Sequence, residues 1–320
     1  MTAETTDTIA NLNTEGLSLK SVNLWQITWH RIFRRKSAVV GMIILGILVI
    51  IALTAQWIAP YDPTRSMLDI DPPQKVKARA VPCIHLFGCP EDQPQHLAGI
   101  DGNLRDQFSR LLYGSRLSLI VGFSTVTFAI IIGTILGALA GYSGGWIDNL
   151  IMRVMDVLLA FPSLLLAIAI VTVLGPGLIN ALLAIGIVSI PAYARVMRAS
   201  VLSVREMDFV SATRSLGGNT YEILFKCILP NALTPLIVQG TLGIASAILD
   251  AAALSFLGLG AQPPTPEWGS MLGAERNQVF TAPHLVFYPG LAIMLTVLSF
   301  NLIGDGLRDA LDPRLVHVSS

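Results

Sequence analysis

The sequence predicts an all-α membrane protein with six transmembrane helices. Of its 320 residues, 53% are hydrophobic and 13% are charged, and the mean hydropathy of +0.64 is well above that of soluble domains. The apolar residues form continuous runs close to the ~20 residues that a helix needs to cross a bilayer, not the alternating segments of a β-barrel. The six predicted spans are residues 38–58, 117–141, 154–174, 178–197, 233–259 and 286–303.

The positions of Lys and Arg predict a cytoplasmic N-terminus. Four of these residues lie between positions 31 and 36, directly before the first span. Six crossings then make both termini cytoplasmic, and the inner side holds 13 of the 21 Lys and Arg residues. The predicted parts are a cytoplasmic N-terminal segment (1–37), the first span (38–58), a periplasmic outer loop (59–116), a membrane domain (117–305) that includes the cytoplasmic segment 198–232, and a cytoplasmic tail (306–320).

The outer loop contains two cysteines that are close in sequence. Cys83 and Cys89 lie on the oxidising side of the membrane, so we expect a disulfide between them. Free thiols are one alternative, and a metal site that uses His85 or His96 is another, although the spacing matches no standard zinc pattern. Cys227 lies on the inner side, where we expect it to be a small helix residue.

The second span carries a stripe of glycines. Gly133, Gly137 and Gly141 recur every four residues, which places them on one face of a helix. Small residues in this pattern let a second helix approach closely in a membrane. We therefore expect helix packing there, within this chain or with a partner.

One acidic residue, Asp250, lies inside the fifth predicted span. Exposing a carboxylate to lipid costs about 3 kcal/mol on the mildest scale, so this side chain should face protein or water. We favour a structural or gating role in the pathway over direct contact with a solute, and both interpretations stay open.

The cytoplasmic segment 198–232 begins with a predicted short amphipathic helix. Its apolar positions follow the spacing i, i+3, i+4, i+7, which gathers them on one stripe. Gly217 and Gly218 end this helix. The stripe consists of Phe209, Ala212, Thr213 and Leu216.

A second amphipathic helix follows the glycine pair. Asn219 is placed to cap it, with Glu222 three residues later as a capping-box acid. The same apolar spacing repeats, and Pro230 is predicted to end the helix. The second stripe consists of Tyr221, Leu224, Phe225 and Ile228.

A bent helix pair held at the membrane surface by two spans has the form of a knob that fits a partner's groove. The alternative is that both stripes lie on the membrane or on this chain's own helices. Periodicity alone does not decide between them.

Motifs for catalysis are missing. A phosphate-binding loop needs a Gly-Lys-Ser/Thr step, and no Lys in this sequence follows a Gly. The zinc motif His-Glu-x-x-His does not occur either. We therefore expect no enzyme activity, no catalytic residue, no metal and no cofactor bound by this chain.

The cytoplasmic segment carries a family resemblance. The order Ala212, Gly217, Leu229 and Pro230 has the spacing of the E-A-A-x3-G-x9-I-x-L-P motif of ABC-type importer permeases. "DFVSATRSLGG" followed by "ILPN" looks like the dipeptide, oligopeptide and nickel branch. The glycine bend and the proline are retained. Departures are Ser211 for Glu, Thr213 for the second Ala and Cys227 for Ile.

The resemblance covers nearly all of residues 38–315. "HLAGIDGNLRDQFSRLLYGSRLS" is similar to the outer motif H-x-x-G-T-D-x-x-G-R-D-x-x-S-R-x-x-x-G-x-R-x-S of that branch. Ile100 and Leu104 replace its Thr and second Gly, which puts the local turn in question. Further similar segments are "GGWIDNLIMRVMDVLLAFPSLLLAI", "ILDAAALSFLGLGAQPPTPEWGSML" and "FNLIGDGLRDALDPRL". The chain most resembles the C-type subunit of dipeptide permeases.

This resemblance implies a type I ABC importer permease fold in a bacterial inner membrane. A second permease would pair with the chain, two cytosolic ATPases would dock on segment 198–232 and use ATP and Mg, and an outer binding protein would deliver the solute; nucleic acid is not implied. The solute would be a di- or oligopeptide, with nickel or another small solute as the alternative. A self-contained channel or secondary transporter is a further alternative, for which Asp250 is the clear candidate residue.

Overall fold

A computed structural model of the chain describes residues 32–69, 76–90 and 93–311. Most of the predicted N-terminal segment (1–31) and the end of the predicted tail (312–320) lie outside the described residues, as do Lys20, Arg31 and Arg314. Within the described ranges the regular secondary structure is helical, and β pairing is limited to two isolated bridges. The predicted all-α fold class is therefore confirmed for this part of the chain.

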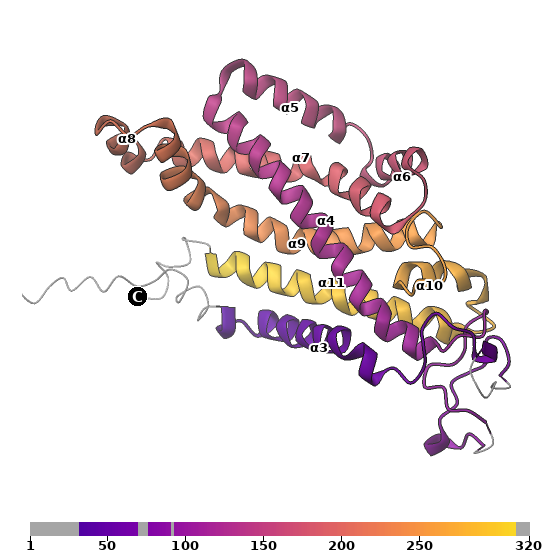
Figure 1. Ribbon diagram of the computed structural model, residues 1–320. Helices are drawn as coiled ribbons and strands as arrows, with labels where there is room; N and C mark the ends of the chain where they lie inside the picture. The colour runs from indigo at the N-terminus through magenta and orange to yellow at the C-terminus, as the bar shows by residue number, and fades with distance from the viewer. Residues whose placement is uncertain (1–31, 70–75, 91–92, 312–320) are drawn as a thin grey trace, which may run out of the picture.

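Five helices in the described residues are long and apolar enough to cross a membrane, or six when one bent pair is taken as a single span. In Figure 1, α4 runs obliquely across one side of the other long helices. It packs most extensively on α7 and also on α9, while α3 packs on α11 and α4. The five long helices are α3 (Lys36–Ile58), α4 (Gln107–Ser143), α7 (Leu178–Arg205), α9 (Leu229–Phe256) and α11 (Pro283–Leu311).

The predicted third span, 154–174, is wrong as a single helix. The chain forms α5 (Gly145–Leu159) and α6 (Ser163–Leu174), which meet at 90°. Pro162 explains the break, because proline has no N–H to donate and disfavours a helical conformation of the residue before it. The apolar run is long enough for a span, but its backbone turns in the middle.

The predicted helix end at Pro230 is also wrong. A π-helical stretch, η3 (Glu222–Ile228), leads directly into α9, and the N–H of Leu229 donates to the carbonyl of Leu224, five residues back. Proline is tolerated in the first turn of a helix, and the wider π turn before it makes room for the ring. The side chain of Asn231 donates to the carbonyl of Cys227 at 2.7 Å, four residues back.

The glycine stripe of α4 lies where this helix crosses α7. A Cβ atom at Gly133 would lie 2.7 Å from the Cβ of Tyr193, and one at Gly137 would lie 2.8 Å from the Cβ of Met197. Real Cβ contacts are essentially never this short. The absence of a side chain is therefore what allows the two backbones to approach.

The start of α4 lies ten residues before the predicted second span. Asp106 caps the helix, because its carboxylate accepts the backbone N–H of Ser109 at 2.7 Å. Leu104, which replaces a family glycine, has a φ of 60°. The turn is thus retained with a leucine in the left-handed conformation, which costs roughly 1–2 kcal/mol.

Buried charges hold the outer segment together. Asp101 contacts Arg105 at 2.8 Å and Arg110 at 3.5 Å, and all three residues are buried. Arg110 also donates to the carbonyls of Pro63 (2.8 Å) and Pro264 (3.0 Å). This cluster ties the outer loop to the start of α4 and to the loop before α10 (Trp268–Glu275). The charged positions of the outer motif therefore fold this end of the molecule.

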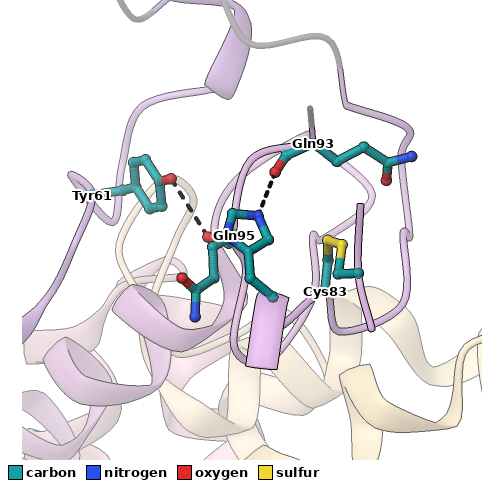
Figure 2. The surroundings of a disulfide bond; sticks show 6 residues. Tyr61, Cys83, Gln93 and Gln95 are labelled. Carbon is teal, nitrogen blue, oxygen red and sulfur yellow. Dashed lines mark hydrogen bonds between the residues drawn. A yellow bond between two sulfur atoms is a disulfide. The ribbon is translucent and has the colours of Figure 1, made fainter. Parts of the chain in front are cut away.

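A disulfide joins Cys83 to Cys89 at the outer end (Figure 2), with the two Cα atoms 5.4 Å apart. The backbones of Cys83 and His96 exchange two hydrogen bonds of 2.9 Å. His85 bonds the carbonyl of Gln93 at 2.8 Å, a contact that Figure 2 also shows. Both outer thiols are thus engaged in the disulfide, which leaves no thiolate for the alternative metal site.

Candidate functional site

The candidate site is the knob between α7 and α9, here called the inner knob and defined as residues 205–228. It contains α8 (Asp208–Ser215) and η3. In Figure 1, α8 projects from one end of the bundle, at the end where α3 starts and α11 finishes. The outer loop and α10 lie at the opposite end.

Three buried aliphatic side chains anchor the inner knob. Val210 on α8 is fully buried, as is Ile228 at the end of η3, and Ile223 is nearly so. Ile223 and Ile228 are five residues apart, which is the spacing of the i→i+5 ladder. The predicted stripes followed an α-helical period and so did not include Ile223, or Val210, which directly follows Phe209 in the sequence.

An arginine at the end of α7 fixes the base of the knob. Arg205 donates from Nη1 to the carbonyls of Gly141 (3.2 Å) and Tyr142 (3.3 Å). These carbonyls belong to the last turn of α4, where a cation is favoured by the helix dipole. The base of the inner knob is therefore tied by hydrogen bonds to the ends of two long helices.

The corner between the two halves requires glycine. Gly217 has a φ of +85°, in the region that L side chains rarely adopt. The N–H of Gly218 donates to the carbonyl of Thr213 at 3.0 Å and that of Gly217 to Arg214 at 3.1 Å, which closes the end of α8. A Cβ atom at Gly218 would lie 2.8 Å from the Thr213 methyl group.

Asn219 caps the second half, because its side-chain oxygen accepts the N–H of Glu222 at 2.8 Å. The backbone N–H of Asn219 interacts in return with the Glu222 carboxylate, as expected of a capping box. Glu222 also accepts a hydrogen bond from Lys226 at 3.2 Å, one turn later on the exposed surface. The ion pair with Lys226 is available because the two side chains stand at i and i+4.

The outward face of the knob is apolar. Leu216, at the corner, is 89% exposed, and Phe225 is 50% exposed. The rings of Tyr221 and Phe225 lie 4.7 Å apart. Met207 and Phe209 are also exposed, and these five large apolar side chains are here called the apolar face of the knob.

Some residues of the two predicted stripes are buried or half-buried, and the others are exposed. Thr213 and Leu224 are half-buried and Ile228 is buried, so these three pack on the chain itself. The alternative in which both stripes rest on this chain's own helices is wrong for the remaining members, because they are exposed. Those exposed members are Phe209, Ala212, Leu216, Tyr221 and Phe225.

Comparison with known proteins places this geometry in a family. Residues 133–317, more than half of the chain, match the family described as binding-protein-dependent transport system inner membrane components. The chain belongs to this family. Residues 23–80 match the N-terminal transmembrane domain of oligopeptide transport permease C. The permease is thus a subunit of an ABC importer and a multi-pass protein of the inner membrane, as the sequence predicted.

Three relatives cover almost the whole permease. A di/tripeptide transport system permease of Pseudomonas aeruginosa is 50% identical over 293 residues, which is 91% of this chain and 92% of the relative. A dipeptide transport system permease of Alkalihalophilus pseudofirmus is 48% identical over 92% of this chain and 91% of its own. A glutathione transport system permease of Pectobacterium atrosepticum is 45% identical over 91% of each chain.

The fold is also shared with a solved importer. The inward-facing MetNI methionine ABC transporter contains a chain that aligns with a TM-score of 0.54 and 18% identity, covering 63% of this permease and 97% of that chain. At this identity the likeness shows the fold alone. It confirms the predicted type I importer fold.

Proposed function

We propose that this permease is one of two membrane subunits of an ATP-driven importer for di- and oligopeptides. The identity of about half of all residues to a di/tripeptide and a dipeptide permease, over nearly the full length of both chains, carries the proposal. The second permease is a homologous chain, and an extracytoplasmic binding protein delivers the peptide. Both termini face the cytoplasm together with the inner knob.

The inner knob is the proposed docking site for a cytosolic ATPase subunit. Its apolar face is open, its base is fixed by Val210, Ile223 and Ile228, and its corner is closed by backbone hydrogen bonds. Two such subunits bind and hydrolyse ATP with Mg, and their closure moves the knob. Arg205 passes this motion to the ends of α4 and α7. The peptide pathway between the two permease subunits then changes from open towards the outside to open towards the cytoplasm.

Uptake assays test the substrate. A strain that lacks the permease gene, complemented with the wild-type chain, should take up a labelled dipeptide and a labelled longer peptide, and energy depletion should stop both. Uptake of labelled nickel alone would replace the peptide proposal with the nickel alternative. Uptake that persists without any ATPase subunit would favour a channel or secondary transporter.

A further inference from the structure

Asp250 lies on a polar stripe of α9 that the permease itself leaves open. Ser246 precedes it by four residues and Gln239 precedes Ser246 by seven, so all three share one face of the helix. Ser246 is exposed, and the other two are half-buried. Among the residues that the structure describes, Asp250 has no hydrogen bond and no ion pair.

The opposite face of α9 is the packed one. A Cβ atom at Gly122 of α4 would lie 2.6 Å from Ile248 and 3.3 Å from Ile244. Because α4 covers this apolar side, the stripe with Asp250 points away from α4. An uncompensated carboxylate is not stable against lipid, so water or another polar group must face it in the assembled transporter.

The stripe leads to a groove of mixed polarity at the end of the molecule that carries the inner knob. Gln239 lines this groove, of about 420 Å³, together with Thr234 and Arg308. Towards the other end, Leu249 and Ala253, the helix neighbours of Asp250, line an apolar groove of about 700 Å³ between α9, α10 and α11. A carboxylate beside an apolar groove matches a ligand that carries an ammonium group and an apolar side chain.

We infer that Asp250 contacts the N-terminal ammonium group of the peptide as it passes through the permease. This inference rests on the proposed peptide import, and it assigns Asp250 to substrate contact in place of a gating role. The carboxylate offers the charge-assisted hydrogen bond that an ammonium group loses when it leaves water. Gln239 and Arg308 then offer polar groups further along the path towards the cytoplasm.

Substitutions that change the charge or the size of the side chain at position 250 test the inference in the full transporter. Asp250→Asn should lower dipeptide uptake about tenfold or more, because a hydrogen bond to a charged group is lost, whereas Asp250→Glu should retain most of the uptake. Asp69→Asn, the same chemical change on the exposed outer loop, is the matched control and should transport at the wild-type rate. Co-purification of the second permease should be unchanged in all three variants, and Asp69→Asn should also keep the basal ATPase activity.

Chemical rescue provides a second readout. In a Cys227→Ser background, Asp250→Cys should be nearly inactive, and a negatively charged methanethiosulfonate should restore uptake several-fold while a positively charged one should not. The labelling of this thiol should be slowed by transported dipeptide.

Four results would overturn the assignment. Equal uptake by the wild type and Asp250→Asn, or equal loss in the Asn and Glu variants, would exclude an ammonium contact. Loss of the second permease on purification of Asp250→Asn would instead assign the carboxylate to an ion pair between subunits. A wild-type transporter that carries no peptide would remove the proposed function and this inference together, whereas peptide uptake that is insensitive to position 250 removes only the inference.

Discussion

Single residues decide the conformation at the corner of the inner knob. Gly217→Val should strain the turn by roughly 1–2 kcal/mol, because a β-branched residue is forced to the observed φ of +85°. No atom lies within 4 Å of the position that its Cβ would take, so the strain comes from the backbone and not from a clash. We expect normal membrane insertion, reduced co-purification of the ATPase subunits and reduced peptide uptake.

Gly217→Asn is the control for this substitution. Asparagine tolerates the left-handed conformation, so this variant should keep most of the ATPase recovery and uptake. Equal behaviour of the Val and Asn variants would show that the left-handed turn is not what docking depends on.

Leu104 also has a left-handed backbone conformation, but there the residue is a leucine and not a glycine. The family motif has a glycine at this position, and the chain keeps the positive φ with a leucine. The N–H of Met67 donates to the Leu104 carbonyl at 2.8 Å, and the N–H of Leu104 donates to Asp101 at 3.1 Å. One local hydrogen bond and one from the distant Met67 therefore hold a turn that the local sequence disfavours.

Within η3, exposed side chains are expected to serve docking, and buried side chains are expected to serve folding. Phe225→Ala should weaken ATPase association by about 1–3 kcal/mol if the exposed ring enters the partner's groove, and should leave thermal stability unchanged. Ile223→Ala is the matched comparison, because this side chain is buried on the opposite face and its truncation should lower stability by about 2–5 kcal/mol. Thermal aggregation in detergent and co-purification of the ATPase distinguish the two effects.

Normal ATPase recovery and normal uptake with Phe225→Ala and Gly217→Val together would reject the docking assignment. That outcome would favour a knob that lies on the membrane surface.

The crossing of α4 and α7 makes a second prediction at this scale. Gly137→Ala should destabilise the permease by about 1–3 kcal/mol, since its new methyl group would overlap the Met197 side chain. Gly46→Ala on α3 is the control: nothing lies within 4 Å of the added atom, and the higher helix propensity of alanine should raise stability by up to about 1 kcal/mol. Opposite shifts of the melting temperature in detergent are therefore expected, and shifts of the same sign would contradict this packing.

Sidedness is a property of the whole molecule. In right-side-out spheroplasts, a membrane-impermeant maleimide should leave the permease unlabelled until a reductant opens the Cys83–Cys89 disulfide. Inverted vesicles should show labelling of Cys227, which is free and partly exposed in η3 of the inner knob. Cys227→Ser is the control and should abolish the signal from inverted vesicles.

Quantitative labelling of both outer thiols without reductant would reject the disulfide. Labelling of Cys227 from the outside would reverse the proposed topology.

Sequence reasoning predicted much of this molecule because membrane burial and helix corners leave local signatures. Five of the six predicted spans correspond to single long helices, and the two halves of the inner knob meet at Gly217 as expected. The outer motif was found by its spacing, but its function as a buried ion cluster around Asp101 was not. Charges in a polar loop give no local sign of whether they are buried.

The sequence by itself determined that the chain spans a membrane with about six helices and where its inner corner lies. Continuous apolar runs and a glycine pair are sufficient for both, since each depends on neighbours along the chain. Only the tertiary structure decided that the third span bends by 90°, that η3 adopts a π-helical ladder and that the Asp250 face of α9 stays open. Pro162 permits the break in the third span, but the angle of the bend, the π-helical turn and the open face also depend on which distant helices pack against each element, and helical periodicity along the chain does not encode that packing.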